Sequence, residues 1–297
     1  MRCARHRLAR QRQRLCRVER RRTTGWHGSG HRASRGPHPG CLGCSGGQRA
    51  HARAFSQRAK EVGADAVIAM TPYVQELEDE ESIVRYYETI GRAAQLPIFI
   101  QNHARGSVLS ISTMVRLLNE VEQVEYVKEE TFPVTHKITG LIEQGGDKLK
   151  GVFGGVGGRY LLQEYPRGVA GQMPGCHVTD VVVRLWNALE ASDWVEAKRV
   201  FGLMSPLFAL ETLRGSNYPE VLRRRGVTSS ARSRLSTTPP TIDAHDYAAL
   251  DDILRDLEPL FTWSNGPLKY GPPEDAGVAS QRLADGSSNV ATFDRAG

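Results

Sequence analysis

A lysine followed by two glutamates closes a short apolar run, and this is the first feature of the sequence that could do chemistry. In "VEYVKEE" the β-favouring Val124 and Val127 lead directly into Lys128. A lysine there is either a solvated strand terminus or a buried amine with a chemical role. We expect Glu129 and Glu130 to face opposite ways, one into the mouth of a barrel and one into a helix layer, because successive side chains of a strand alternate.

Four other apolar runs also end in residues that are unusual for a buried strand. These ends are Thr71-Pro72-Tyr73, Gln101-Asn102, Gly154-Gly155 and Met173-Pro174. In a β/α barrel the carboxyl ends of the strands form the active-site face. The pattern therefore predicts that these residues gather around Lys128.

The elements that must position these residues alternate along the chain. Strands are predicted at 64–70, 96–101, 124–128, 150–155 and 168–173, and helices at 51–62, 79–95, 110–121, 134–146 and 159–168. Each strand is apolar throughout, which is typical of parallel strands buried on both faces and indicates an α/β fold. A (β/α)8 barrel is the main interpretation. A doubly wound sheet is second, since no G-x-G-x-x-G follows a strand and "GGVGG" alone is weak evidence for phosphate binding.

The first fifty residues have a different composition from the rest. They contain 13 arginines and one acid, Glu19, whereas the remainder carries 26 basic and 32 acidic residues. Enrichment in Arg, Gly, Pro, His, Cys and Ser without Lys, Ile or Phe favours out-of-frame translation of a GC-rich gene. The alternatives are a disordered basic arm that binds nucleic acid and a zinc site on Cys41-x2-Cys44, for which the signal is weak.

The predicted organisation thus has four parts. An atypical segment covers 1–50, the carboxyl-terminal part of a barrel covers 51–178, helices fill 179–261, and a Gly-, Ser- and Pro-rich tail at 262–297 is expected to be disordered. No apolar run approaches 18 residues, and the first twenty residues lack the apolar core of a secretory signal. A single cysteine after residue 50, Cys176, suggests a reducing, cytoplasmic location.

The order of motifs resembles the dihydrodipicolinate synthase / N-acetylneuraminate lyase family over roughly 51–261. The motifs that carry the resemblance are "GADAVIAMTPY", "LPIFIQN", "VEYVKEET", "GVFGG" and "GVAGQMPG". The family folds as a β/α barrel with extra carboxyl-terminal helices, and its lysine at the end of the sixth strand forms a Schiff base with a 2-oxo acid. Lys128 matches that lysine. The side chains of Val124, Val127 and Val152 are expected to surround its amine. The resemblance implies a lyase that needs no cofactor, a small 2-oxo acid as substrate and a homo-oligomer.

The same resemblance implies the other site residues and exposes two departures. Gly154, Gly155, Met173 and Tyr73 match positions near the bound 2-oxo acid, although ordinary turn and packing roles explain the glycines and Met173 equally well. Gln101 stands where the family usually has a proton-relaying tyrosine, and an amide cannot relay a proton at an accessible pKa. Aldol cleavage or dehydration of a 2-oxo-3-deoxy sugar acid therefore fits better than the lysine-biosynthetic condensation.

The second departure lies at the front of the chain. The family's first three strands are not recognisable, so the barrel is expected to be incomplete, with open apolar edges. This predicts a poorly folded or inactive chain. The alternatives to a Schiff-base lyase are therefore a catalytically inactive or truncated relative and, third, nucleic-acid binding through the Arg-rich segment.

Overall fold

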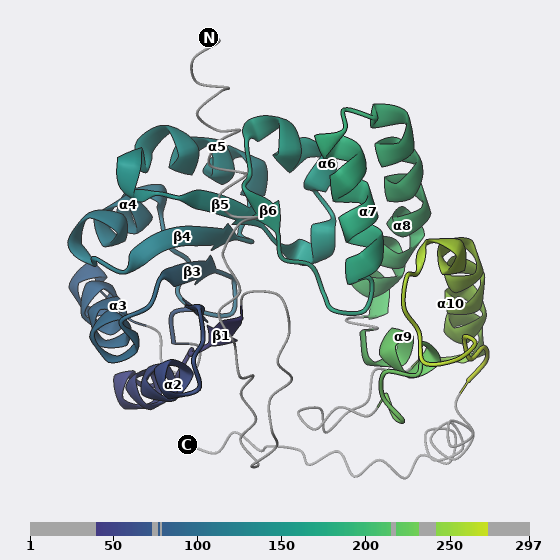
Figure 1. The fold of residues 1–297 in the computed structure, drawn as a ribbon, viewed down its shortest axis with the longest axis horizontal. Coiled ribbons are helices and arrows are strands. Elements are labelled where there is room, and N and C mark those ends of the chain that lie inside the picture. The colour runs from purple at the N-terminus through teal and green to yellow at the C-terminus, as the bar shows by residue number, and fades with distance from the viewer. Residues whose placement is uncertain (1–39, 73–76, 78, 215–217, 232–241, 273–297) are drawn as a thin grey trace, which may run out of the picture. The chain divides into compact units, whose positions relative to one another are not determined.

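The computed structural model describes residues 40–72, 77, 79–214, 218–231 and 242–272, drawn in colour in Figure 1. The chain divides into two compact units, Met1–Met173 and Pro174–Gly297. The Arg-rich segment up to residue 39 lies outside the described residues, and so does Tyr73.

The first unit is built on a parallel sheet whose strands follow one another in chain order. Within the described residues the sheet has six strands: β1 (Cys41–Gly43), β2 (Ala66–Ala69), β3 (Ile98–Asn102), β4 (Val124–Glu129), β5 (Gly151–Gly154) and β6 (Gly171–Gln172). Each strand pairs only with its chain neighbours, from β1 to β6. Such an order is that of an incomplete β/α barrel, because every crossover returns to the adjacent strand.

Helices connect the strands and cover one side of the curved sheet (Figure 1). They are α2 (Arg49–Glu61), α3 (Glu80–Ala94), α4 (Ile111–Glu120), α5 (Val134–Gln144) and α6 (Leu161–Glu164), with short 3-10 turns η1 (Gly146–Lys148), η2 (Val156–Gly158) and η3 (Tyr165–Arg167). Asp79 caps α3 by accepting the N–H of Ser82, and Ser110 caps α4 by accepting the N–H of Thr113. These caps confirm the helix starts that the sequence predicts at 79 and 110.

The structure differs from the predicted elements at both ends of the sheet. Cys41–Gly43 forms a strand against β2, so the sheet begins inside the segment 1–50 that composition sets apart. At the other end, the strand predicted over 168–173 shortens to Gly171–Gln172 because Gly168 adopts a left-handed conformation with φ of 96°. The predicted helix 159–168 is broken into α6 and η3, where Pro166 cannot donate to a continuing helix.

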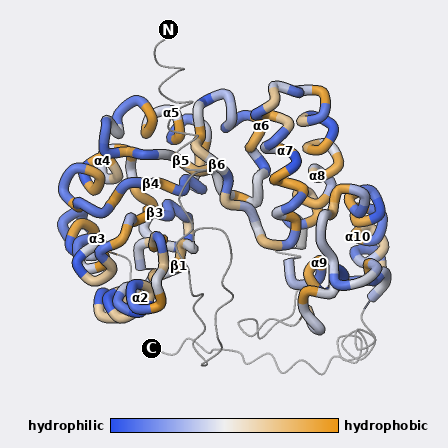
Figure 2. Tube along the Cα trace, viewed as in Figure 1, coloured by the Kyte–Doolittle hydropathy of each residue, from blue (hydrophilic) through white to orange (hydrophobic). Residues whose placement is uncertain are grey.

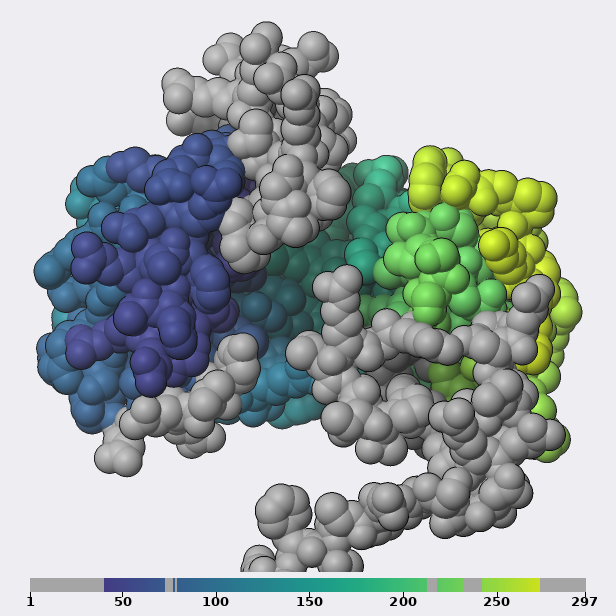
Figure 3. Space-filling view, turned by 90° about the horizontal axis from the view of Figure 1, so that it is seen from below, coloured from purple at the N-terminus to yellow at the C-terminus, as the bar shows by residue number. Residues whose placement is uncertain are grey.

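The core of the first unit lies between the sheet and its helices. Val67, Ile98, Ile100 and Val127 are fully buried, as are the helix residues that pack on them, including Ile90. Figure 2 shows hydrophobic residues along the central strands, as expected for a buried parallel sheet. Helix α2, in contrast, exposes most of its residues, and Figure 3 shows it as a purple surface beside the blue surface of α3.

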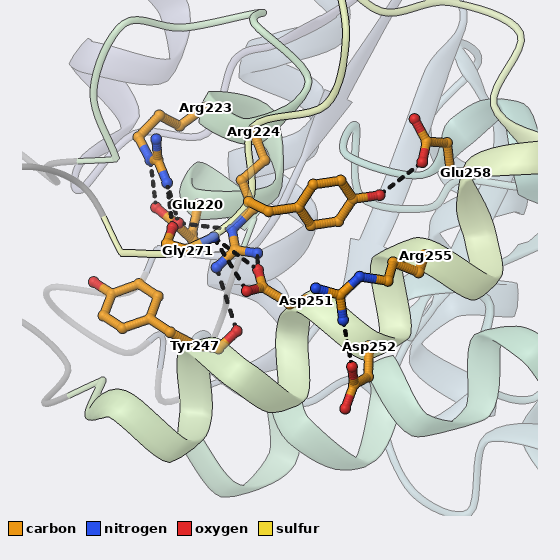
Figure 4. A network of polar contacts seen from close by, with 10 residues as sticks. Glu220, Arg223, Arg224, Tyr247, Asp251, Asp252, Arg255, Glu258 and Gly271 are labelled. Carbon is orange, nitrogen blue, oxygen red and sulfur yellow. Dashed lines mark hydrogen bonds and ion pairs between the residues drawn. The ribbon is translucent and has the colours of Figure 1, made fainter.

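The second unit is helical in its described part. Its elements are α7 (Thr179–Glu190), α8 (Trp194–Arg214), α9 (Tyr218–Arg224), α10 (Ala244–Leu257) and the 3-10 turn η4 (Glu258–Leu260). Three consecutive arginines from the "VLRRRG" segment are buried here. Arg224 is completely buried, and its guanidinium contacts the carboxylates of Glu220 and Asp251 (Figure 4).

The first part of the segment predicted to be disordered, residues 262–272, is ordered, and the remainder, 273–297, lies outside the described residues. The chain after η4 returns to α9, where Asn265 N–H donates to Arg225 O over 2.8 Å and Lys269 N–H donates to Arg224 O over 2.9 Å. Thr262 N–H also donates to Asp180 of α7 over 2.9 Å. Backbone hydrogen bonds of this kind order residues 262–271 despite their loop-like composition.

None of the helices in the described ranges is long and apolar enough to cross a lipid bilayer.

Candidate functional site

Lys128 lies near the carboxyl end of β4, in the middle of the sheet. Its neighbours in register are Gln101 on β3 and Phe153 on β5. The Lys128 side chain is 13% exposed, so the amine is largely withdrawn from water but open on one side. A strand end that is flanked by two further strands therefore holds this amine in a fixed place.

Aromatic side chains, rather than the expected valines, line the face that carries Lys128. Tyr126 is two residues earlier on the same face, and its ring stacks on Phe99 with 4.3 Å between ring centres. Phe153 packs edge-on against Phe99 with centres 5.3 Å apart. Val127 and its register partner Val152 point to the opposite face, into the helix layer. Val124 pairs with the buried Ile98 on the far side of an irregularity in register, so the prediction that these three valines surround the amine was wrong.

Glu130 is the charged partner of the amine. Its Oε2 atom lies 3.1 Å from Lys128 Nζ and accepts a hydrogen bond of 2.6 Å from Gln101 Nε2. Its other oxygen, Oε1, accepts the backbone N–H of Val156 over 3.0 Å. The carboxylate therefore joins the ends of three neighbouring strands to the amine.

These contacts determine the ionisation of Glu130. Burial by itself raises the pKa of this carboxyl, but the Lys128 ammonium, the Val156 N–H and the Gln101 amide outweigh burial and lower the pKa below its ordinary value. Glu130 is thus a carboxylate at neutral pH, and the amine beside it is its counter-ion.

Glu129 faces the other way, as the alternation of the strand predicts. It is fully buried, and its carboxylate accepts hydrogen bonds from Asn102 Nδ2 over 2.9 Å and from the N–H and hydroxyl of Thr131. Burial raises the pKa of Glu129, while these hydrogen bonds oppose the rise. The prediction of opposite facings is confirmed, and the structure assigns Glu130 to the site and Glu129 to the helix layer.

The two glycines after β5 allow side chains to approach the backbone closely. A Cβ atom on Gly155 would lie 2.3 Å from Glu130 Cγ, and one on Gly154 would lie 2.0 Å from Glu164 Oε2. A side chain at position 154 would displace the ends of Glu164 and Gln172, and one at position 155 would displace Glu130 from its place beside Lys128. Met173 donates its N–H to Gly154 O over 3.0 Å, so it borders the same turn.

Two residues of this region carry no signal in the sequence pattern. They are Glu164, at the end of α6, and Gln172, in β6. Their side-chain oxygens lie next to the position that a Cβ atom on Gly154 would take. In the sequence Glu164 looks like one acid among the many of the chain, and only its burial distinguishes it. Glu130 was visible in the sequence, but no partner could be assigned to it because two of its contacts come from a strand and a turn that are 29 and 26 residues away.

Cys41 begins β1 and Cys44 follows it, and the earlier cysteines that a zinc site could use lie outside the described residues. Cys44 is buried, which raises the pKa of its thiol to about 11, whereas Cys41 is exposed. In the ranges that the structure describes, no three His, Cys, Asp or Glu side chains are grouped so that they could hold a metal ion.

Comparison with known sequences supports the geometry. The model of the dihydrodipicolinate synthetase family matches residues 42–200. An L-2-keto-3-deoxyarabonate dehydratase from Azospirillum brasilense is 31% identical over 212 residues, which cover 70% of this chain and 68% of that relative. A 4-hydroxy-tetrahydrodipicolinate synthase from Chelativorans sp. is 32% identical over 95 residues, and the match spans 32% of that protein.

Comparison with solved structures supports the fold. The dihydrodipicolinate synthase of Rhodopseudomonas palustris aligns with a TM-score of 0.66 at 23% identity, covering 74% of this chain and 75% of that one. A catalytic lysine mutant of the sialic acid aldolase of Ruminococcus gnavus also aligns with a TM-score of 0.66, at 15% identity and covering 77% of each chain. The described strands and helices therefore correspond to part of a complete β/α barrel.

Proposed function

The chain belongs to the dihydrodipicolinate synthetase family, whose members are lyases, and from this membership we propose that it binds a 2-oxo acid covalently through Lys128. The observation that carries the proposal is the contact of 3.1 Å between Lys128 Nζ and the Glu130 carboxylate at the carboxyl end of β4. An amine of this kind attacks a ketone only when it is neutral, and a carboxylate in contact with it accepts the proton that it must lose.

The first half of the reaction forms an imine. Lys128 passes one proton to Glu130, and its free nitrogen forms a bond to C2 of the 2-oxo acid. The nitrogen gives a second proton to the C2 oxygen, which becomes a hydroxyl. Glu130 then returns its proton to this hydroxyl, the C2–O bond breaks, and water leaves. The product is a protonated imine, which withdraws electrons from C3.

The second half makes use of the same carboxylate. Glu130 removes a proton from C3, and the electron pair of the C–H bond moves into an enamine. In a 2-oxo-3-deoxy sugar acid, the enamine then expels the C4 hydroxyl, to which Glu130 returns the proton, so that water leaves. A single carboxylate thus carries the proton in both directions, while Gln101 holds it by a hydrogen bond and needs no proton of its own.

Dehydration of a 2-oxo-3-deoxy sugar acid is the reaction that we propose. The glutamine at position 101 supports it, because an amide cannot replace a tyrosine that relays protons to an aldehyde oxygen. The name of the Azospirillum brasilense relative, a dehydratase of a keto-deoxy sugar acid, supports the same substrate class. Aldol cleavage of the same class of compound is second, since it begins from the same imine.

Borohydride trapping tests the proposal. The purified chain is incubated with pyruvate or with 2-oxo-3-deoxyarabonate, reduced, and digested for mass spectrometry. We expect a covalent adduct on the peptide that contains Lys128, and no adduct in Lys128→Met. Lys137→Met, which removes another lysine of the same unit, serves as the control and should keep the adduct. A folded chain that gives no adduct with either compound would contradict the proposal and support an inactive, incomplete barrel.

A further inference from the structure

Glu164 is a buried acid that the proposed reaction does not use. It closes α6, its side chain has no exposed surface, and neither carboxylate oxygen has a hydrogen-bond partner among the residues that the structure describes. A buried ionised carboxylate without donors is very unfavourable, so this residue needs a physical explanation.

The neighbouring side chain of Gln172 makes a charged Glu164 still less favourable. Glu164 Oε2 and Gln172 Oε1 lie 2.0 Å and 2.3 Å from the point where a Cβ on Gly154 would be, so the two oxygens lie beside each other. Gln172 Oε1 is also buried and receives no hydrogen bond. Two acceptors placed together repel unless one of them carries a proton.

Rotating the Gln172 amide does not remove the conflict. Its Nε2 atom donates to the carbonyl oxygen of Gly155 over 3.0 Å. Exchanging Oε1 and Nε2 would satisfy Glu164 but would place an oxygen against the Gly155 carbonyl, so that one pair of acceptors would replace another. The group lacks one donor in either orientation. A proton on Glu164 supplies it, because a neutral carboxyl donates one hydrogen bond.

The electrostatics agree with this assignment. Burial, and after it the negative charge of Glu130, raise the pKa of Glu164 to about 8, so the residue is a neutral acid at neutral pH. Besides Glu130, the charged and titratable groups of β4 and α5 are Glu125, Lys128, Glu129, His136, Lys137 and Glu143, and Arg159 and Arg167 flank α6 and η3. His136 and Glu143 are exposed. Lys128 is paired with Glu130, and Lys137 donates to Thr131.

Gln172 connects Glu164 with the turn that contacts Glu130. The Gly155 carbonyl that Gln172 holds precedes Val156, whose N–H donates to Glu130 Oε1 over 3.0 Å. Val156 has φ of 51°, which is strained for a β-branched residue, so this turn keeps its shape only if its surroundings hold it.

We propose that Glu164 is a positioning residue whose neutral carboxyl donates to Gln172 and thereby fixes the turn that presents the Val156 N–H to Glu130. The inference rests on the proposed function, in which Glu130 carries the proton. When pH rises through about 8, Glu164 ionises, its donor is lost, and the turn is released. Turnover therefore falls on the alkaline side because the position of Glu130 is no longer fixed.

Infrared difference spectroscopy of the full chain tests the proton on Glu164 without any substrate. The carbonyl stretch of a protonated carboxyl should be present at neutral pH, should disappear as pH rises through about 8, and should be absent from Glu164→Gln. Glu143→Gln, the same change at an exposed position of α5, is the control and should keep the band. Identical spectra for the wild type and Glu164→Gln would overturn the inference.

The pH profile of kcat tests the positioning role. Glu164→Gln keeps a neutral donor at every pH, so it should retain turnover at neutral pH and lose the alkaline decline. Glu164→Leu has no donor and should lower kcat on the order of tenfold to hundredfold at neutral pH, with the Lys128 adduct still formed. An unchanged alkaline decline in Glu164→Gln would contradict the inference, whereas a missing adduct in the wild type would contradict the proposed function instead.

Discussion

The Glu130 carboxylate lies 3.1 Å from the Lys128 amine, and the two residues share one face of the chain because they are two positions apart. Gln101 of β3 and Val156 of the turn after β5 hold the same carboxylate. The amine and the carboxylate beside it are therefore positioned by the carboxyl ends of neighbouring strands.

Glu130→Gln should slow both halves of the proposed reaction. The amide keeps the shape of the side chain but cannot accept a proton, so we expect turnover to fall by about 10²–10⁴-fold and the borohydride adduct on Lys128 to form more slowly. Turnover of 2-oxo-3-deoxyarabonate and trapping with pyruvate measure the two effects. Glu125→Gln, which removes the partner of Lys150 on the same strand, is the control and should leave both unchanged.

Gln101→Ala should shift the acidic side of the pH profile. The Gln101 amide is one of the hydrogen bonds that lower the pKa of Glu130, so its loss raises that pKa toward the ordinary value. Because the proposed reaction needs the carboxylate, the decline of kcat on the acidic side of its pH profile should begin at a higher pH in this variant. Gln163→Ala, at an exposed position of α6, is the control. A profile that does not move in Gln101→Ala would contradict a role of this amide in holding Glu130.

Gly155→Ala should remove activity without unfolding the chain. The new Cβ would lie 2.3 Å from Glu130 Cγ, so the carboxylate must leave its place beside Lys128. The loss should appear in kcat, while the far-ultraviolet circular dichroism stays that of the wild type. Gly202→Ala in α8 is the matched control, since its Cβ meets nothing within 4 Å. That change should keep activity and stabilise the helix by about 0.5–1 kcal/mol, because alanine is the better helix former.

The stability of the first unit should depend on pH through Glu164. The folded-state pKa of about 8 is above the ordinary value of 4.5, so the folded chain binds more protons than the unfolded chain between these values. The free energy of unfolding should therefore fall as pH rises from about 4.5 to about 8. Urea unfolding across this range should show the decline in the wild type and a flatter curve in Glu164→Gln. A curve of equal slope in both proteins would contradict the raised pKa.

Arg224→Met should destabilise the second unit strongly. It leaves the half-buried Asp251 carboxylate without its arginine and the buried Glu220 with Arg223 alone (Figure 4), and breaking a buried ion pair typically costs about 3–5 kcal/mol. Arg255→Met breaks the exposed pair with Asp252 and should cost no more than about 1 kcal/mol. Urea unfolding of the two variants provides the comparison, and equal losses would contradict a structural role for the buried arginine.

The strands and the lysine could be predicted because their signals are local. Apolar runs such as Ile98–Ile100 and Val124–Val127 form strands wherever they are buried, and Lys128 marks the end of one of them. The strand Cys41–Gly43 was missed because three residues in an arginine- and glycine-rich context carry too little pattern. The segment after residue 262 was missed for a related reason, since its order comes from hydrogen bonds to α9 and α7 and not from its own composition.

The sequence by itself determined the α/β fold, the family and the place of Lys128 near a strand end, because periodicity and motif order are properties of the chain. Only the tertiary structure decided that Glu130 contacts Lys128, that Glu129 turns away, and that Glu164 lies unpaired beside Gln172. The reason is physical: ionisation and hydrogen bonding depend on atoms within a few ångströms, and those atoms come from segments that are distant in sequence.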